Sequence, residues 1–126
     1  TVLNQAYLSG NGWTLKPGDV GFNSGHTWIV IGQCSDKSVV IVHSTPNAGV
    51  QISGTSTPGG NYNSEAAYLA AQYMSRYAGF SKYNYHTSCG NYIRNGNYLR
   101  WNGSTLSDPD GYKNMTADQI LADLFS

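Results

Sequence analysis

The fold is decided by two β-branched stretches, His26-Thr27-Trp28-Ile29-Val30-Ile31-Gly32 and Ser38-Val39-Val40-Ile41-Val42-His43-Ser44. Both are apolar on both faces, which is typical of strands that are buried from two sides. The short polar connection 33–37 lies between them, so we expect them to pair as an antiparallel hairpin. One stretch begins with a histidine and the other nearly ends with one.

The length of the connection sets which residues of the hairpin face each other. If the loop is Gln33 to Asp36, Gly32 faces Lys37 and His26 lies directly opposite His43. Directly opposed residues point to the same face, with their Cβ atoms about 4.5–5.5 Å apart. We therefore expect the two imidazole rings to lie within about 6 Å of each other on one face. A loop one residue longer or shorter would offset this register.

The flanking sequence predicts further strands and helices. Pro17-Gly18 indicates a turn that leads into a strand at 20–22, and Val50-Gln51-Ile52-Ser53-Gly54 alternates like another strand. Helical spacing of apolar residues predicts a helix over 64–77 with Ser64 as its N-cap. The stretch 78–110, rich in Gly, Asn and Tyr, receives no assignment.

The last predicted element is a helix that begins with the capping box Thr116-Ala117-Asp118-Gln119. We expect Ile120, Leu121 and Leu124 to face the core. Together the elements predict an α+β class: a small antiparallel β-sheet with flanking helices, forming a single domain over 1–126.

The composition limits the partners. The 126 residues carry seven basic and seven acidic side chains, so no net charge attracts nucleic acid or an anionic membrane. No apolar stretch approaches the roughly 20 residues of a membrane span, and no signal peptide is apparent at Thr1. A low-charge surface rich in Tyr, Asn and Ser is typical of an extracellular protein. Cys34 and Cys89 allow one disulfide or two thiols, and their number does not decide between these states.

Two facing histidines are suited to activating a nucleophile. One imidazole accepts the proton of a thiol or hydroxyl group, and the other holds the first in the required tautomer. A single histidine at a strand end is more often a partly exposed polar residue. Two of them at opposed positions of one hairpin favour catalysis.

The order of four motifs resembles the NlpC family of papain-like cell-wall cysteine peptidases. The motifs are Leu15-Lys16-Pro17-Gly18-Asp19-Val20, the stretch from Gly25-His26 to Gly32, Val42-His43-Ser44, and Gly49-Val50-Gln51-Ile52-Ser53. The resemblance covers roughly 15–54. It implies a papain-like fold with His26 as the general base and His43 as the orienting residue. It also implies that the protein hydrolyses peptide amides of bacterial peptidoglycan and needs no metal or other cofactor. Such a protein acts outside the cell at the bacterial cell wall, or is encoded by a phage.

The nucleophile is where the sequence departs from this family. Family members carry the cysteine on a helix upstream of the Pro-Gly-Asp turn, and no cysteine precedes Leu15 here. The chain is therefore the C-terminal portion of a longer catalytic domain, a permuted member that uses Cys89, or a non-catalytic member. We favour the first, with an upstream segment or a second chain supplying the cysteine, because the glycine and asparagine after Cys89 discourage a helix. Cys34 lies at the far end of the hairpin from His26, about 20 Å away, and is excluded.

Other residues support less specific hypotheses. Trp28 and Ser44 are candidate substrate-binding residues beside the histidine pair, and Asp19 is expected to cap backbone amides of its turn. An aromatic cluster of Tyr83, Tyr85, Tyr92 and Tyr98 would equally suit glycan stacking or packing. The alternatives to a peptidoglycan hydrolase are thus a cell-wall glycan- or peptide-binding module and a permuted thiol hydrolase or acyltransferase acting on lipids or other amides.

Overall fold

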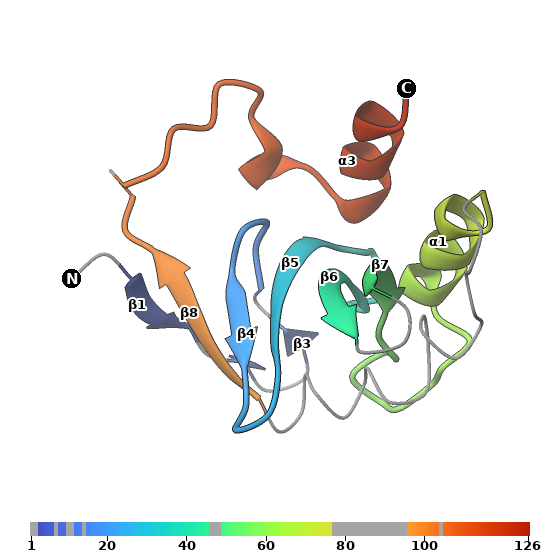
Figure 1. Ribbon diagram of the computed structural model, residues 1–126, viewed down its shortest axis with the longest axis horizontal. Helices are drawn as coiled ribbons and strands as arrows, with labels where there is room; N and C mark the ends of the chain where they lie inside the picture. The colour runs from blue at the N-terminus through green and yellow to red at the C-terminus, as the bar shows by residue number, and fades with distance from the viewer. Residues whose placement is uncertain are drawn as a thin grey trace.

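The fold is seen in a computed structural model, which describes residues 3–6, 8–9, 12–13, 15–45, 49–76, 96–103 and 105–126. Six of its strands form one sheet in the order β1-β8-β4-β5-β6-β7 (Figure 1). Their bounds are Leu3–Ala6 (β1), Asn97–Trp101 (β8), Val20–Phe22 (β4), Thr27–Gln33 (β5), Val39–Thr45 (β6) and Gly49–Gly54 (β7). All neighbouring strands are antiparallel. Leu8–Ser9 (β2) and Gly12–Trp13 (β3) form a separate two-stranded sheet.

Two α-helices complete the described part and confirm the expected α+β class. Helix α1 spans Glu65–Met74, and its N-cap Ser64 accepts a hydrogen bond from the amide of Ala67 at 3.1 Å, as the sequence predicts. Helix α3 spans Ala117–Leu124 and begins with the predicted capping box. A short 3-10 helix, η2 (Tyr112–Asn114), precedes it.

One prediction about α3 is wrong. Leu124 is 57% exposed rather than directed to the core, whereas Ile120 and Leu121 are buried as expected. The apolar contact at the C-terminal end of the helix is made by the next residue, Phe125, whose ring centroid lies 4.9 Å from that of Tyr73 in α1. The residue that packs at this end is thus decided by the position of α1. The sequence of α3 alone does not reveal that position.

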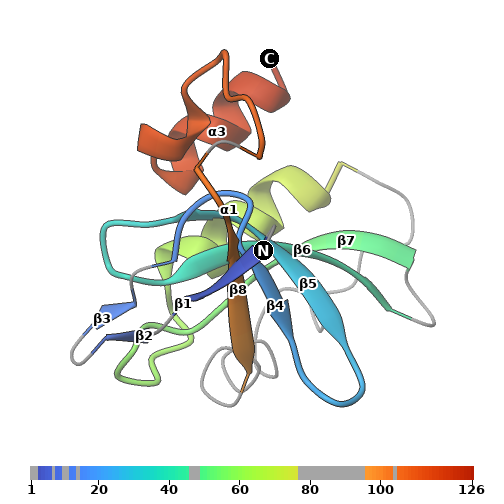
Figure 2. The same cartoon turned by 90° about the vertical axis from the view of Figure 1, so that its left-hand side faces the viewer.

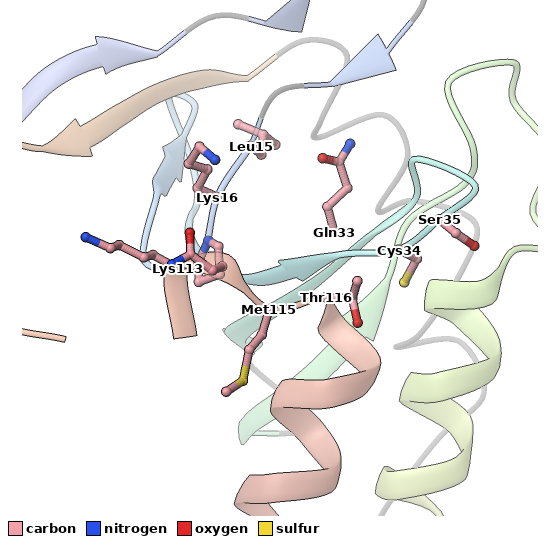
Figure 3. Close-up of a pocket in the computed structure, with 10 residues that line it drawn as sticks. Leu15, Lys16, Gln33, Cys34, Ser35, Lys113, Met115 and Thr116 are labelled. Atoms are coloured by element: carbon pink, nitrogen blue, oxygen red, sulfur yellow. The ribbon is translucent and has the colours of Figure 1, made fainter. Parts of the chain in front are cut away.

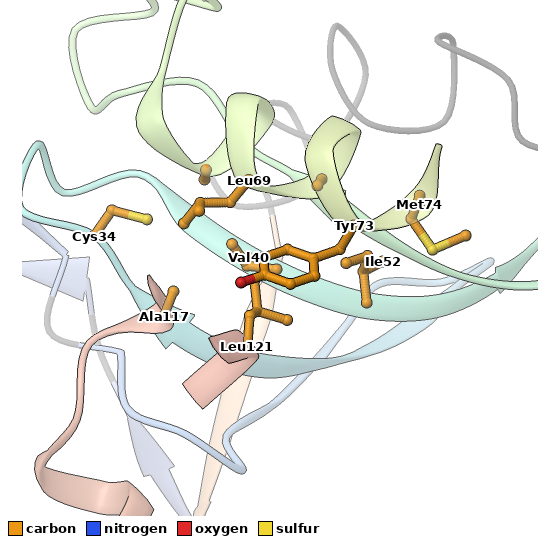
Figure 4. Close-up of a cluster of buried hydrophobic side chains, with 10 residues drawn as sticks. Cys34, Val40, Ile52, Leu69, Tyr73, Met74, Ala117 and Leu121 are labelled. Carbon is orange, nitrogen blue, oxygen red and sulfur yellow. The ribbon is translucent and has the colours of Figure 1, made fainter. Parts of the chain in front are cut away.

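The helices lie on one side of the sheet (Figure 2). Between them and the sheet is a cluster of buried side chains that includes Val40, Ile52, Leu69 and Leu121 (Figure 4). Helix α1 approaches β7 so closely that a Cβ atom on Gly54 would stand 2.1 Å from the carbonyl carbon of Ala66. This glycine is therefore required by the helix–sheet contact.

The opposite face of the sheet has its own core. Leu15, Trp28, Val30, Val39, Ile41 and Tyr98 form a second buried cluster there. The two clusters divide β6 by alternation, because Val39 and Ile41 belong to one and Val40 to the other. The face that buries Trp28 and Ile41 is the one that carries the histidines.

Candidate active site

The two histidines are in direct contact, as the sequence predicts. The Nε2 atom of His26 lies 2.8 Å from the Nδ1 atom of His43. Their ring centroids are 5.1 Å apart and the rings meet edge to face at 77°. His26 is half-buried, whereas His43 is 7% exposed.

The register that brings them together is not the predicted one. Trp28, not His26, pairs with His43, and Gly32 pairs with Val40 rather than Lys37. The connection is longer than assumed, because Gln33 pairs with Val39. A β-bulge between Val30 and Gly32 then adds one residue to β5; without it Ile29 would oppose His43, and His26 would lie on the other face of the sheet. His26 therefore lies two residues beyond the cross-strand partner of His43, on the same face.

The tight turn between β4 and β5 positions His26 for a diagonal contact with His43. The amide of Asn23 donates to the carbonyl of His26 at 2.9 Å, and the side chain of Asn23 accepts from the amide of Gly25 at 2.9 Å. The turn thus holds His26 at the end of the strand, where a side chain reaches a diagonal neighbour. The imidazole pair is formed diagonally rather than directly across the strands.

A third polar residue, Ser53, extends the pair. Its Oγ atom lies 2.8 Å from Nε2 of His43, and its side chain is fully buried. Ser53 pairs with Ile41 across β6 and β7, which places it diagonally from His43 on the same face. The sequence alone does not indicate this role for Ser53. The alternation of β7 is the one signal for it, because alternation places Ser53 on the face of His43 once the register is known.

The hydrogen-bonded series His26–His43–Ser53 specifies how protons can be arranged. Each neutral imidazole carries one N–H, so the series runs in one direction or the other. If His26 donates from Nε2 to His43, then His43 donates from Nε2 to Ser53, and Nδ1 of His26 is a base. In the reverse arrangement Nδ1 of His26 carries the proton. Only the first arrangement allows His26 to accept a proton without changing its contact with His43.

Burial keeps His43 neutral. Removal of its ring from water, followed by repulsion from a charge on His26, lowers the pKa of His43 from 6.5 to about 4. At neutral pH His43 is therefore an uncharged hydrogen-bond partner. Both of its nitrogens lie at hydrogen-bond distance from neighbours.

A buried aromatic pair supports the ring of His26. The indole of Trp28 stacks on His26 at a centroid distance of 5.9 Å, and its Nε1 donates to the hydroxyl of Tyr98 at 3.1 Å. The indole crosses β4 at Gly21, where a Cβ atom would lie 2.2 Å from Nε1 of Trp28. At 1% exposure Trp28 offers a substrate almost no surface, so its structural effect is to position His26.

The remaining candidate residues lie elsewhere. Ser44 is exposed and follows His43 directly on β6, which directs it to the opposite face of the sheet. Cys34 is a buried free thiol at the other end of the β5–β6 hairpin from His26. Of the aromatic cluster, Tyr98 is buried against Trp28. The other three tyrosines and Cys89 lie outside the described residues.

One group of side chains has the composition of a metal site. Donor atoms of Cys34, Asp36 and Glu65 all lie within 4.8 Å of one another. The two carboxylates already accept hydrogen bonds, Asp36 from the Ser38 hydroxyl and from the first amide of α1, and Glu65 from Ser35. Burial raises the pKa of the Cys34 thiol to about 12, so the thiol is protonated at neutral pH when no metal is bound. These contacts cap α1 and join it to the β5–β6 turn.

The Pro-Gly-Asp turn is held by more than the predicted cap. Asp19 accepts from the amide of Lys16 at 2.8 Å, as expected, and it also receives two hydrogen bonds from Arg100 at 2.9 and 2.7 Å. Arg100 lies on β8, within the stretch that received no assignment. This ion pair between half-buried Arg100 and buried Asp19 fixes the start of β4 to β8, and β4 in turn leads to the turn that carries His26.

Comparison with protein-family models, with curated proteins and with solved structures found no match to this chain. None of the helices in the described ranges is long and apolar enough to cross a membrane.

Proposed function

We propose that this chain contributes the histidine half of a thiol-dependent amide hydrolase of the papain-like, NlpC type, acting on peptide bonds of bacterial peptidoglycan. The observation that carries the proposal is the series His26–His43–Ser53, with 2.8 Å at both contacts. In this assignment His26 is the general base, and His43 and Ser53 orient it. The nucleophilic cysteine comes from an upstream segment or a second chain.

The assignment of the two histidines follows from their surroundings. His43 is 7% exposed, has neighbours at both nitrogens and has a pKa lowered to about 4, so it is suited to hold another ring rather than to exchange protons. His26 is half-buried and uses Nε2 for His43. In this assignment the other ring nitrogen of His26, Nδ1, exchanges the proton with the thiol.

The proposed reaction has two stages. In the first, Nδ1 of His26 takes the proton of the cysteine thiol, and the sulfur attacks the amide carbonyl carbon. The imidazolium then gives that proton to the leaving amine as the C–N bond breaks, which leaves a thioester. In the second stage His26 takes a proton from water, the resulting hydroxide displaces the sulfur, and the proton returns to the thiolate. Throughout, Nε2–H of His26 stays donated to His43.

The substrate class rests on the motif resemblance and on the composition. A chain with equal numbers of basic and acidic residues suits a substrate of low charge density, and the four motifs over 15–54 resemble those of cell-wall peptidases. Peptidoglycan stem peptides are the partners that this proposal names, and the cell wall or the extracellular space is the corresponding location.

The proposal is tested on purified peptidoglycan. The product of the complete reading frame, including any segment before Thr1, is compared with the 126-residue chain, each with and without a thiol-alkylating reagent. We expect the complete product to release peptides whose new amino groups can be counted, and alkylation to stop the release. Release that persists after full alkylation would contradict a thiol mechanism.

A further inference from the structure

Two adjoining cavities lie away from the histidine pair. Their volumes are about 400 and 440 Å³, and Lys16, Pro17 and Lys113 line both of them. Both are built around the turn that precedes β4, whereas His26 follows β4, so the cavities and the pair occupy opposite ends of this strand. Each volume falls within the range of small-ligand sites.

Four of the ten residues that line the smaller cavity have uncharged polar side chains. Gln33, Ser35, Asn114 and Thr116 contribute amide and hydroxyl groups to it. In Figure 3, Lys16 and Lys113 stand at the end of this cavity opposite Cys34 and Ser35. Such a lining is suited to a ligand rich in hydroxyl or amide groups.

The larger cavity adds apolar surface. It is lined by Trp101, Pro17 and Leu106, and Leu106 is 54% exposed. The indole of Trp101 is held in place because its Nε1 donates to the carbonyl of Gly18 at 2.9 Å. A fixed aromatic side chain of this kind packs well against the apolar part of a sugar ring or a small side chain.

The charged residues of the lining favour an anion. Lys16 and Lys113 are exposed, while the guanidinium of Arg100 is paired with Asp19 at 2.7 Å. The other acidic lining residue, Asp108, accepts from the amides of Tyr112 and Lys113 at 2.9 and 3.1 Å. Three cations thus meet two carboxylates that already have partners. The other acidic residues of the C-terminal part, Asp110, Asp118 and Asp123, line neither cavity.

We propose that the two cavities form one binding site for a carboxylate attached to a sugar or to a short peptide. The carboxylate lies between Lys16 and Lys113, the apolar part of the ligand packs on Trp101, and its hydroxyl or amide groups enter the smaller cavity. The site is separate from the histidine pair, and its ligand affinity does not depend on the proposed hydrolysis.

The experiment uses the 126-residue chain, ¹⁵N-labelled, and three probes. N-acetylmuramic acid and N-acetylglucosamine share a pyranose and an acetamido group, but only the former has a carboxylate, and N-acetyl-D-alanine has a carboxylate without a sugar. Chemical-shift changes at the backbone amides of Lys16 and Lys113 and at the indole N–H of Trp101 report binding. We expect N-acetylmuramic acid to bind about tenfold more tightly than N-acetylglucosamine, as a charge-assisted contact predicts.

Lys113→Gln and Lys16→Gln should each reduce this preference, and the double variant should remove it. Lys37→Gln is the matched control, because Lys37 is exposed in the β5–β6 turn and lines neither cavity. If N-acetyl-D-alanine binds as tightly as N-acetylmuramic acid, the carboxylate of the ligand belongs to a peptide. If it binds more weakly, the carboxylate belongs to an acidic sugar. Equal binding of the two sugars, no binding of any probe, or a preference that survives the double lysine variant would overturn the proposal.

Discussion

Nε2 of His26 lies 2.8 Å from Nδ1 of His43, although the two residues are not cross-strand partners. The β-bulge in β5 puts His26 on the same face as His43, and the turn before β5 holds His26 at the end of the strand, so that the two rings meet diagonally. The contact therefore depends on the backbone at two separate places.

The first prediction concerns the titration of His43. Its ring should titrate near pH 4, because burial and the neighbouring His26 disfavour the charged form. Long-range ¹H–¹⁵N correlation of the imidazole nitrogens between pH 3.5 and 8 measures this value directly. A His43 ring that titrates near pH 6.5 would contradict the buried, neutral role.

The same shift predicts how stability depends on pH. The folded pKa of His43 is lowered, so the unfolded chain binds more protons between about pH 4 and 6.5. The contribution of His43 to stability is therefore complete above pH 6.5 and is lost as the pH falls towards 4, by at most about 1.4 kcal/mol for each pH unit. Urea unfolding of the wild type and of His43→Gln at several pH values should show a smaller acid dependence in the variant.

Ser53→Ala tests the third member of the series. Loss of the hydroxyl leaves Nε2 of His43 without this buried partner, which should cost about 1 kcal/mol of stability and reduce hydrolysis several-fold in the complete protein. Ser53→Thr keeps the hydroxyl and should restore most of the activity. If Ser53→Ala leaves both the pH–rate profile and the His43 nitrogen shifts unchanged, Ser53 has no part in orienting the pair.

Gly21→Ala tests the support behind His26. The added Cβ would stand 2.2 Å from the indole of Trp28, so the indole must move and its stacking on His26 must change. We expect a loss of about 1–3 kcal/mol in unfolding free energy, as for overpacking in a core. Gly59→Ala is the control, because the nearest atom to its Cβ would be 3.9 Å away. Equal stability of the two variants would contradict the described position of Trp28.

A further prediction distinguishes between the possible locations of the nucleophilic cysteine. The 126-residue chain alone should not hydrolyse peptidoglycan. Cys34 is buried with a pKa raised to about 12, and the glycine and asparagine that follow Cys89 disfavour the helix that would activate its thiol. The measurement is the fall in turbidity of a cell-wall suspension. It is made with this chain, with its Cys34→Ser variant and with its Cys89→Ser variant. Strong lysis that only Cys89→Ser abolishes would establish the permuted arrangement instead.

The sequence predicted those parts of the fold that are encoded locally. Ser64 and Thr116 cap their helices as their side chains suggest, and the strands β4 to β7 follow from β-branched and alternating residues. The contact of the two histidines was also predictable, because both end apolar strands of one hairpin.

The rest depends on contacts between distant segments. Neither the length of the connection nor the bulge after Val30 has a local signature in these apolar strands, so the predicted register was wrong. The predicted contact of the rings was right, because the bulge keeps both histidines on one face. Strand β8 pairs with β1 and β4 and lies in a stretch of mixed composition, so neither Arg100 nor its ion pair with Asp19 could be predicted. Ser53 joins the site only through the pairing of β7 with β6.

The central claim is that His26 is the proton acceptor for a thiol, and its substitution in the complete protein tests this most directly. Initial rates of amide hydrolysis on purified peptidoglycan are compared for the wild type, His26→Ala, His43→Ala and the control Tyr68→Ala, whose side chain is 70% exposed on α1. We predict a loss of about 10²–10⁴-fold for His26→Ala, the range for removal of a general base. His43→Ala should lose less, because water partly replaces an orienting group, and Tyr68→Ala should match the wild type. Full activity of His26→Ala would contradict the assignment.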